Sequence, residues 1–335
     1  MLSKPYLFLF LCLAVNFSAY ESFAQCNKHD TTRQYHMYVG QPCGIGINNN
    51  RIVVTSYNQD SFGAPAAVQV WNDRFLFTIG QPATSTFTLI SPEAVTFDAA
   101  GNMYVVQTER PDSNIMIYNT SLALIAVIGN APGLPAHWNN PRGMAIDSAG
   151  SLYVVSQDST YIDTGTAHRT IDVPGTGKLI KIADPLGTAT KTVLMTGLYG
   201  PKAVAIKGDN LYISEYSANR VSRYNTATLA RVDTIAITRP VDLATTGCLL
   251  FCSEQGSHTI KVMNAADLSA GVQESIHQFD TAKSPSGIAL DNEYNIFISD
   301  NENNKVAEFK QQMQRYVNLA IWLVKQSCSF FGVCC

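Results

Sequence analysis

The chain has 335 residues, a formal net charge of −3 at pH 7, 46% hydrophobic residues and 15% charged residues. So mild a charge balance gives no reason to expect nucleic acid or an anionic membrane as a partner. The length suits one large domain, because no Pro/Ser-rich linker, charge block or low-complexity stretch divides the chain.

The first residues have the pattern of a secretory signal peptide. Lys4 supplies a positive start, and the apolar run from Tyr6 to Val15 is too short to span a bilayer. Small residues in Ser22-Phe23-Ala24 precede the expected cleavage site. Residues 1–24 are therefore predicted to be removed, which makes the mature protein secreted and leaves no membrane span. A retained N-terminal anchor is the alternative.

The mature chain then repeats one short pattern, in which a proline opens an apolar run. Six prolines begin these units at spacings of about 50, 49, 60, 39 and 45 residues, a period typical of repeat arrays. They are Pro42, Pro92, Pro141, Pro201, Pro240 and Pro285. Each unit contains short runs rich in Val, Ile and Tyr that are separated by turn residues. Four strands in a period of about 45 residues predict one blade of a β-propeller.

Three of the units carry a more specific resemblance. Trp138-Asn139-Asn140-Pro141-Arg142-Gly143-Met144-Ala145-Ile146-Asp147 is followed by a strand-like run, and the later units contain Tyr212-Ile213-Ser214-Glu215 with Asn219-Arg220-Val221, and Phe297-Ile298-Ser299-Asp300 with Asn304-Lys305-Val306. This pattern resembles the NHL repeat family over about residues 34–310. The resemblance implies a six-bladed β-propeller in a family that is mostly a binding scaffold and includes some enzymes. The fifth unit departs from the pattern, with Asp242 at the glycine position.

A strand-like segment, Gln34 to Gly40, precedes the first proline. It is predicted to be the outer strand of the last blade and to pair with Val306–Phe309, so that no free edge remains between first and last blades. The predicted fold is all-β: a six-bladed β-propeller of four-stranded antiparallel blades, closed by an N-terminal strand. Residues 25–33 form a lead, 34–310 the propeller, and 311–335 a tail of unknown structure: a covering helix, a competing strand or a gene-model error.

Two long insertions are predicted to lie on the same face as the proline turns, because the blades are antiparallel. They are Tyr57 to Ala66 and Gln157 to Gly177. Long loops are more often functional than short ones. Tyr161, His168 and Arg169 of the second insertion are therefore candidate binding residues, and a mobile decoration without function is the alternative.

The residues that follow the prolines are predicted to surround the mouth of the central channel. Glu93, Arg142, Lys202 and Asp242 are the candidate ligand contacts among them. Two acids and two bases make this ring nearly neutral, so it prefers neither anions nor cations. Structural or solvating roles are the alternative for all four residues.

Other acidic residues have a structural explanation. Asp98, Asp147 and Asp291 begin hairpin turns, where aspartate caps local amides. The run from Asp300 to Asn304 has the alternating oxygens of a calcium loop but lacks its glycine and distant glutamate, and it coincides with a predicted hairpin.

Catalytic signatures are missing from the sequence. It has no Gly-x-Ser-x-Gly elbow, no His-Glu-x-x-His and no phosphate-cradling loop. Lyase relatives in the resembled family bind metal through inner-strand histidines, which this chain lacks after its prolines. We therefore expect a non-catalytic scaffold for protein, peptide or glycan, without cofactor. The alternatives are a metal-dependent, lactonase- or lyase-like enzyme that binds Ca²⁺ or Zn²⁺ through Glu93 and Asp242, and a matrix protein joined through tail cysteines.

The chain has eight cysteines, and the segment predicted to remain after cleavage contains one glycosylation sequon. Cys248 and Cys252 lie four apart in a strand-like run, about 13 Å apart, which is too far for a disulfide; both are predicted to be core residues. Cys26 has Cys328, Cys334 and Cys335 as alternative partners. Asn119-Thr120-Ser121 predicts a glycoprotein with Asn119 facing solvent. The protein is expected to be a monomer.

Overall fold

The computed structural model describes residues 29–36, 41–48, 51–56, 67–72, 74–79, 91–108, 113–129, 138, 140–163, 168–276 and 284–311. The predicted signal peptide, the insertion at 57–66 and the tail from residue 312 onward lie outside the described residues. Within the described part, no helix has the length and apolar character needed to cross a membrane.

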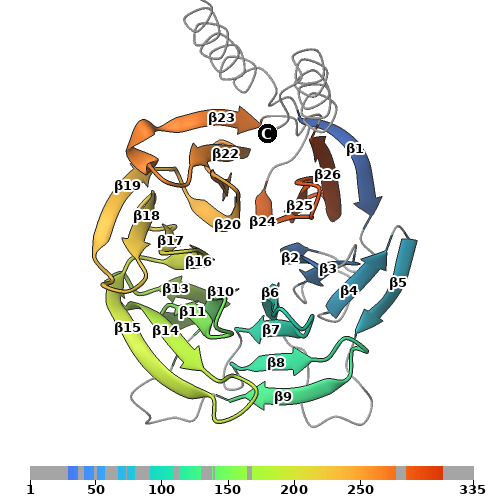
Figure 1. Cartoon of the computed structure of the whole chain (residues 1–335), viewed down its shortest axis with the longest axis horizontal. Helices are drawn as coiled ribbons and strands as arrows, with labels where there is room; N and C mark the ends of the chain where they lie inside the picture. Colours follow the sequence, from blue (N-terminus) through green and yellow to red (C-terminus); the bar gives the residue numbers. More distant parts are fainter. Residues whose placement is uncertain are drawn as a thin grey trace, which may run out of the picture.

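The described strands form six four-stranded sheets arranged in a ring around a common centre (Figure 1). The first three blades are β2 (Pro42–Asn48), β3 (Arg51–Ser56), β4 (Ala67–Asn72) and β5 (Arg74–Ile79); β6 (Pro92–Phe97), β7 (Met103–Gln107), β8 (Ile115–Tyr118) and β9 (Leu124–Ile128); and β10 (Pro141–Ile146), β11 (Leu152–Ser156), β14 (Gly177–Ala183) and β15 (Thr190–Leu198).

The remaining three blades complete the ring. They are β16 (Pro201–Lys207), β17 (Asn210–Glu215), β18 (Arg220–Asn225) and β19 (Arg231–Ala236); β20 (Pro240–Thr246), β21 (Leu249–Glu254), β22 (Thr259–Asn264) and β23 (Val272–Ile276); and β24 (Pro285–Leu290), β25 (Ile296–Asp300), β26 (Lys305–Gln311) and β1 (His29–His36). One 3₁₀ turn, η1 (Leu268–Ala270), precedes β23. The prediction of an all-β, six-bladed propeller is confirmed.

The N-terminal strand closes the ring as predicted. β1 pairs antiparallel with β26, and Tyr35 lies opposite Val306 (Figure 1). The strand begins at His29 and so includes residues that the sequence analysis placed in the lead, while 37–40 lie outside the described residues. The last blade therefore combines both ends of the described chain.

The core lies between neighbouring blades rather than at the centre of one globule. The second strand of each blade is buried on both faces, because another blade packs on either side; β7 and β11 are buried at every position. Between blades 2 and 3, Ile117 and Val154 lie in one apolar cluster with Trp138. The Trp138 indole N–H donates to the Ser113 carbonyl at 3.2 Å.

Neighbouring inner strands approach each other very closely just after each proline. The ladder shifts register there in all six blades. A Cβ atom on Gly44 would lie 2.3 Å from the Glu93 carbonyl oxygen, and one on Gly287 would lie 2.6 Å from that of Cys43. Glycine is needed at these two positions because the next blade occupies the space of a side chain.

Buried hydroxyl groups join four of the six neighbouring pairs of blades. The Ser299 hydroxyl accepts from the Gly287 amide at 2.7 Å and donates to the Cys43 carbonyl of the next blade at 2.8 Å. The same two bonds are made by a hydroxyl at the equivalent place in blades 1, 4 and 5. We call these side chains the junction hydroxyls: Thr55, Ser214, Ser253 and Ser299. Blades 2 and 3 have Val106 and Val155 at that place.

The turns at the opposite end of the inner strands are capped by aspartate, as predicted. The Asp147 carboxylate accepts from the amides of Ala149 at 3.0 Å and Ser151 at 2.8 Å. Asp98 and Asp291 accept in the same way. In the third copy Tyr294 takes the positive φ of 65° that glycine takes elsewhere. The Asn295 side chain donates to the Asp291 carboxylate at 2.7 Å.

Two of the three cysteine thiols in the described part are buried. Cys43, Cys248 and Cys252 form no disulfide among the residues that the structure describes. Cys252 is buried in β21, as predicted, but Cys248 is exposed, so its assignment to the core is wrong. The reason is that Cys248 precedes β21 in the turn after β20 and never enters the sheet.

The junction hydroxyls predict a specific cost of substitution. Thr55→Val keeps the shape of the side chain but leaves the Gly44 amide and the Glu93 carbonyl without this partner. We expect the free energy of unfolding, measured by urea denaturation, to fall by about 1–3 kcal/mol.

The matched control is Thr192→Val, on the exposed side of β15. It removes a hydroxyl for which the structure gives no bond in a junction, and should change stability by less than about 0.5 kcal/mol. Equal effects of the two substitutions would contradict the role given to the Thr55 hydroxyl.

Candidate functional site

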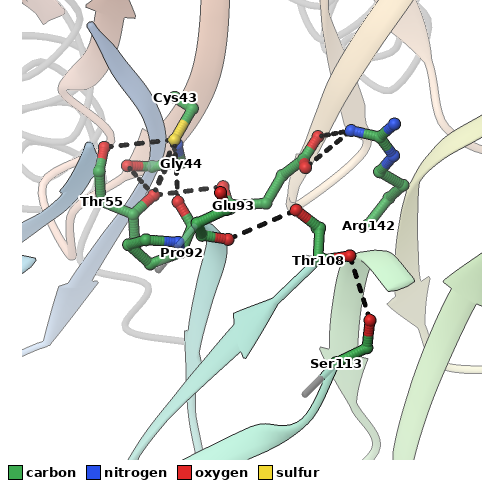
Figure 2. A network of polar contacts seen from close by, with 9 residues as sticks. Cys43, Gly44, Thr55, Pro92, Glu93, Thr108, Ser113 and Arg142 are labelled. Atoms are coloured by element: carbon green, nitrogen blue, oxygen red, sulfur yellow. Dashed lines mark hydrogen bonds and ion pairs between the residues drawn. The ribbon is translucent and has the colours of Figure 1, made fainter. Parts of the chain in front are cut away.

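Glu93 and Arg142, two of the four predicted mouth residues, are paired with each other. Glu93 is the second residue of β6 and Arg142 the second residue of β10, and the Arg142 Nη1 lies 2.7 Å from each Glu93 carboxylate oxygen (Figure 2). Each side chain is only 14% exposed. The pair joins blades 2 and 3, where the junction hydroxyl is replaced by Val106. The two charges therefore neutralise each other and help to hold the ring.

In blade 1 the residue that follows the proline is Cys43, and its side chain does not reach the pair of Glu93 and Arg142 (Figure 2). Cys43 is buried, with its Sγ 3.1 Å from the Pro92 carbonyl oxygen and 3.4 Å from that of Thr55 (Figure 2). The expectation that every residue after a proline surrounds the mouth is therefore wrong for Cys43, and also for Ser286, which is buried. Both side chains are short and bond within the blade junction: Cys43 to the Pro92 carbonyl, and the Ser286 hydroxyl to the Pro42 carbonyl at 3.0 Å.

Lys202, in blade 4, lies beside an aromatic residue. Its ammonium is 5.6 Å from the centroid of the Tyr216 ring, a cation–π geometry. Tyr199, just ahead of the same blade, is 46% exposed, and its backbone amide donates to the Glu215 carboxylate at 3.1 Å. That carboxylate also accepts two bonds from Arg220, at 2.6 and 2.8 Å. This part of the surface combines fixed charge with exposed aromatic area.

Asp242 lies apart from the other three candidates, deeper along the channel. Its Oδ1 accepts from the Leu243 amide of its own blade at 2.8 Å, and its Oδ2 accepts from the Ile288 amide of blade 6 at 2.9 Å. Burial raises the pKa of this carboxyl to about 6, although the two amide bonds act in the opposite direction.

A cavity of about 260 Å³ occupies the centre of the ring. Residues of β2, β6, β10, β20 and β24 line it, and Asp242 is the one ionisable side chain among them. The predicted mouth ring is thus two separate features: a paired rim at Glu93 and Arg142, and a lone carboxyl inside the cavity.

The long insertion of blade 3 is a β-hairpin rather than an irregular loop. β12 (Ser159–Asp163) pairs with β13 (His168–Asp172) as a two-stranded sheet between β11 and β14. The structure places all three insertion candidates on this hairpin: Tyr161 opposite Thr170, Ile162 opposite Arg169, and Asp163 opposite His168. Because β11 ends where β10 begins, the hairpin leaves the blade on the face of the proline turns.

The base of the hairpin is fixed to the ring. The Val173 amide donates to the Asp158 carbonyl at 2.8 Å. Gln157, which is buried, donates to the Thr176 hydroxyl at 2.9 Å and accepts from the Gly200 amide of blade 4 at 3.0 Å. The sequence analysis missed Gln157; its only signal is a polar residue directly after an apolar strand.

Asn119 caps the turn between β8 and β9. Its Oδ1 accepts from the amides of Ser121 and Ala123, both at 3.0 Å. The residue is partly exposed, and the two residues after it are exposed. Glycosylation at Asn119 stays a prediction.

Within the described residues, no group of three or more His, Cys, Asp or Glu side chains gathers as a metal site. The Asp300 carboxylate accepts from the Asn303 side chain at 2.7 Å within an ordinary hairpin turn, which agrees with the structural explanation given to that segment.

Neither a family model nor a curated protein sequence matches the chain. Solved structures do. A chain of the nidogen/laminin complex is 14% identical with a TM-score of 0.56, covering 74% of this chain and 84% of that chain. Virginiamycin B lyase from Staphylococcus aureus is 15% identical with a TM-score of 0.56, covering 84% and 99%. Streptogramin B lyase is 13% identical with a TM-score of 0.54, covering 83% and 96%. Identities this low show a shared propeller fold.

The environment of Asp242 predicts a pH-dependent stability. Burial raises its pKa from about 3.9 in the unfolded chain to about 6 in the fold, so the folded state binds the proton more tightly. The wild-type protein should therefore gain stability as the pH falls from 6 to 4 through this group. Asp242→Ala removes this charge but also leaves the Leu243 and Ile288 amides without their carboxylate partner. The free energy of unfolding of the variant relative to wild type should therefore fall by about 2–3 kcal/mol as the pH falls from 7.5 to 4, in addition to a cost of the lost bonds that does not depend on pH.

Urea unfolding of both proteins at pH 4, 6 and 7.5 checks this. Alanine is the appropriate replacement because Ala94 and Ala203 hold the equivalent positions of blades 2 and 4. A variant that is less stable than wild type by the same amount at every pH would contradict the account of Asp242.

Proposed function

We propose that the chain is a secreted β-propeller of the NHL-repeat type that binds a protein, peptide or glycan. Its binding surface is the insertion face, which we define as the proline turns, the hairpin at 159–172 and the exposed residues beside them on blade 4. The observation that carries the proposal is the ordered hairpin, fixed at its base to two blades. Secretion rests on the pattern of residues 1–24, and family membership rests on the repeated motif.

The anchoring of the hairpin supports this function. Gln157 links its base to Gly200 of the next blade, so the hairpin is held relative to the ring before any ligand arrives. A binding element that is ordered in advance loses less conformational entropy on association. The hairpin is therefore suited to recognition rather than to connection alone, for which a two-residue turn would suffice.

The chemistry beside the hairpin supports the same class of ligand. The Tyr199 ring lies in contact distance of Gly175 at the hairpin base, where a Cβ would be 3.6 Å from the ring. Exposed tyrosine offers apolar area with a polar tip, as binding surfaces do. The Glu93–Arg142 and Glu215–Arg220 pairs leave little net charge at this face, which fits a ligand without strong charge.

Two of the similar structures favour a second candidate, a metal-dependent lyase-like activity. Both are lyases by their titles, and the Asp242 carboxyl in the central cavity offers one oxygen ligand. Glu93 is less suited to be the second ligand than the sequence suggests, because it is paired with Arg142. Elemental analysis of the purified protein, with melting before and after chelation, separates the two candidates: about one bound metal ion and a lower melting temperature after chelation would support the lyase.

The binding function is tested by removing the hairpin without disturbing its base. Residues 159–172 are replaced by Asn-Gly, which bridges Asp158 and Val173, whose backbones are already bonded. Wild type and variant are then compared on a glycan array and on a panel of purified extracellular proteins and their peptides. We expect the variant to lose at least tenfold in affinity for whatever the wild type binds.

Glu293→Ala, in a turn at the opposite end of the inner strands, is the control and should bind as the wild type does. Unchanged affinity of the variant without the hairpin, at unchanged melting temperature, would overturn the assignment of the insertion face.

A further inference from the structure

The central cavity contains a charge that the propeller does not need. The residue two places after the proline is small in five of the six blades: Gly44, Ala94, Gly143, Ala203 and Gly287. In blade 5 this residue is Asp242. In five blades the ring therefore closes with at most a methyl group at this level, so the repeat itself does not require the carboxylate of Asp242.

The junction between blades 5 and 6 has room for this side chain, whereas the junctions that have glycine at this position do not. A Cβ on Gly143 would lie 2.6 Å from the Lys202 carbonyl oxygen of the next blade. Asp242 instead extends to blade 6 and accepts from the Ile288 amide at 2.9 Å. Its carboxylate is thus held in one orientation by amides of two blades, as a binding group must be.

The carboxylate has unused capacity toward the cavity. Each of its oxygens accepts one amide bond and retains a further lone pair. No other residue that lines the cavity is charged or titratable. The Cys252 thiol of β21 interacts with Asp242 electrostatically, but burial raises the pKa of that thiol well above its ordinary value, so it supplies no charge. The charge is kept against the cost of burial, which is typical of functional groups.

The backbone groups of the cavity wall favour one kind of cation over others. Each inner strand is the edge of its sheet, so backbone amides and carbonyls of its free side face the centre. Carbonyl oxygens around one carboxylate suit a cation that donates several N–H bonds. A divalent metal would want six to eight oxygens, several of them charged. The volume of about 260 Å³ is below that of pockets for drug-sized ligands.

We propose that the central cavity binds a small organic cation with N–H donors, a primary ammonium, whose charge lies against Asp242 and whose remaining protons are bonded by inner-strand carbonyls. This site is separate from the insertion face, so either assignment can fail without the other.

The test uses n-propylammonium chloride on the full mature chain at pH 7.5, with binding measured by calorimetry and by the rise in melting temperature. Two probes of similar size accompany it: tetramethylammonium, which carries the charge without N–H donors, and n-propanol, which has no charge. We expect n-propylammonium to bind at least tenfold more tightly than either. Because the Asp242 carboxyl protonates near pH 6, the same affinity should fall about tenfold at pH 5.

Asp242→Ala and Asp242→Asn should each lose at least tenfold in affinity, and the two variants guard against a misfolded one. Glu293→Gln, which removes an exposed charge that does not line the cavity, is the control and should bind n-propylammonium as wild type does. Equal binding of the three probes, binding that survives both Asp242 variants, or no binding of n-propylammonium would overturn the proposal. So would an Asp242-dependent response to Ca²⁺ or Mg²⁺ without one to the amine.

Discussion

The close approach of neighbouring inner strands, just after each proline, is the constraint on which the rest of the structure depends. At this level the backbones of two blades lie too close for a side chain at Gly44, Gly143 or Gly287. This close approach buries backbone amides and carbonyls that have no partner in the hydrogen bonds between strands of one blade. A buried polar group without a partner costs stability. At four junctions the junction hydroxyl accepts from an amide of its own blade and donates to a carbonyl of the next blade. The Glu93–Arg142 pair joins blades 2 and 3. The ring is therefore held from its centre as well as by the strand that closes it.

In this ring the residues that maintain the fold differ from the residues that we propose to bind ligands. The four strands of each blade and the Asp-capped turns supply the frame, which the chain shares with propellers of unrelated sequence. Two features exceed what the frame needs: the hairpin at 159–172 and the carboxyl of Asp242. The hairpin adds surface at the rim, whereas Asp242 adds charge inside the cavity. Rigid surroundings give both additions a defined geometry, which is what binding requires.

Local patterns predicted the features that local residues determine. The blades, the Asp147 turn, the buried Trp138 and the closing strand each follow from apolar periodicity and turn chemistry within a few residues. The separation of Asp242, inside the cavity, from the pair of Glu93 and Arg142 could not be predicted, because it depends on how neighbouring blades are placed. Glu93 and Arg142 lie 49 residues apart. The junction hydroxyls left a signal, Ser or Thr at one strand position in four units, but its meaning appears only when blades are placed side by side.

The most direct test of this account is the rate of amide hydrogen exchange at the residue two places after each proline, measured residue by residue under native conditions. The amides of Gly44, Ala203, Asp242 and Gly287, which are bonded to junction hydroxyls, should exchange more slowly than those of Ala94 and Gly143, whose blades carry valine in place of the hydroxyl. Uniform rates at all six positions would contradict the claim that these hydroxyls hold the blades together.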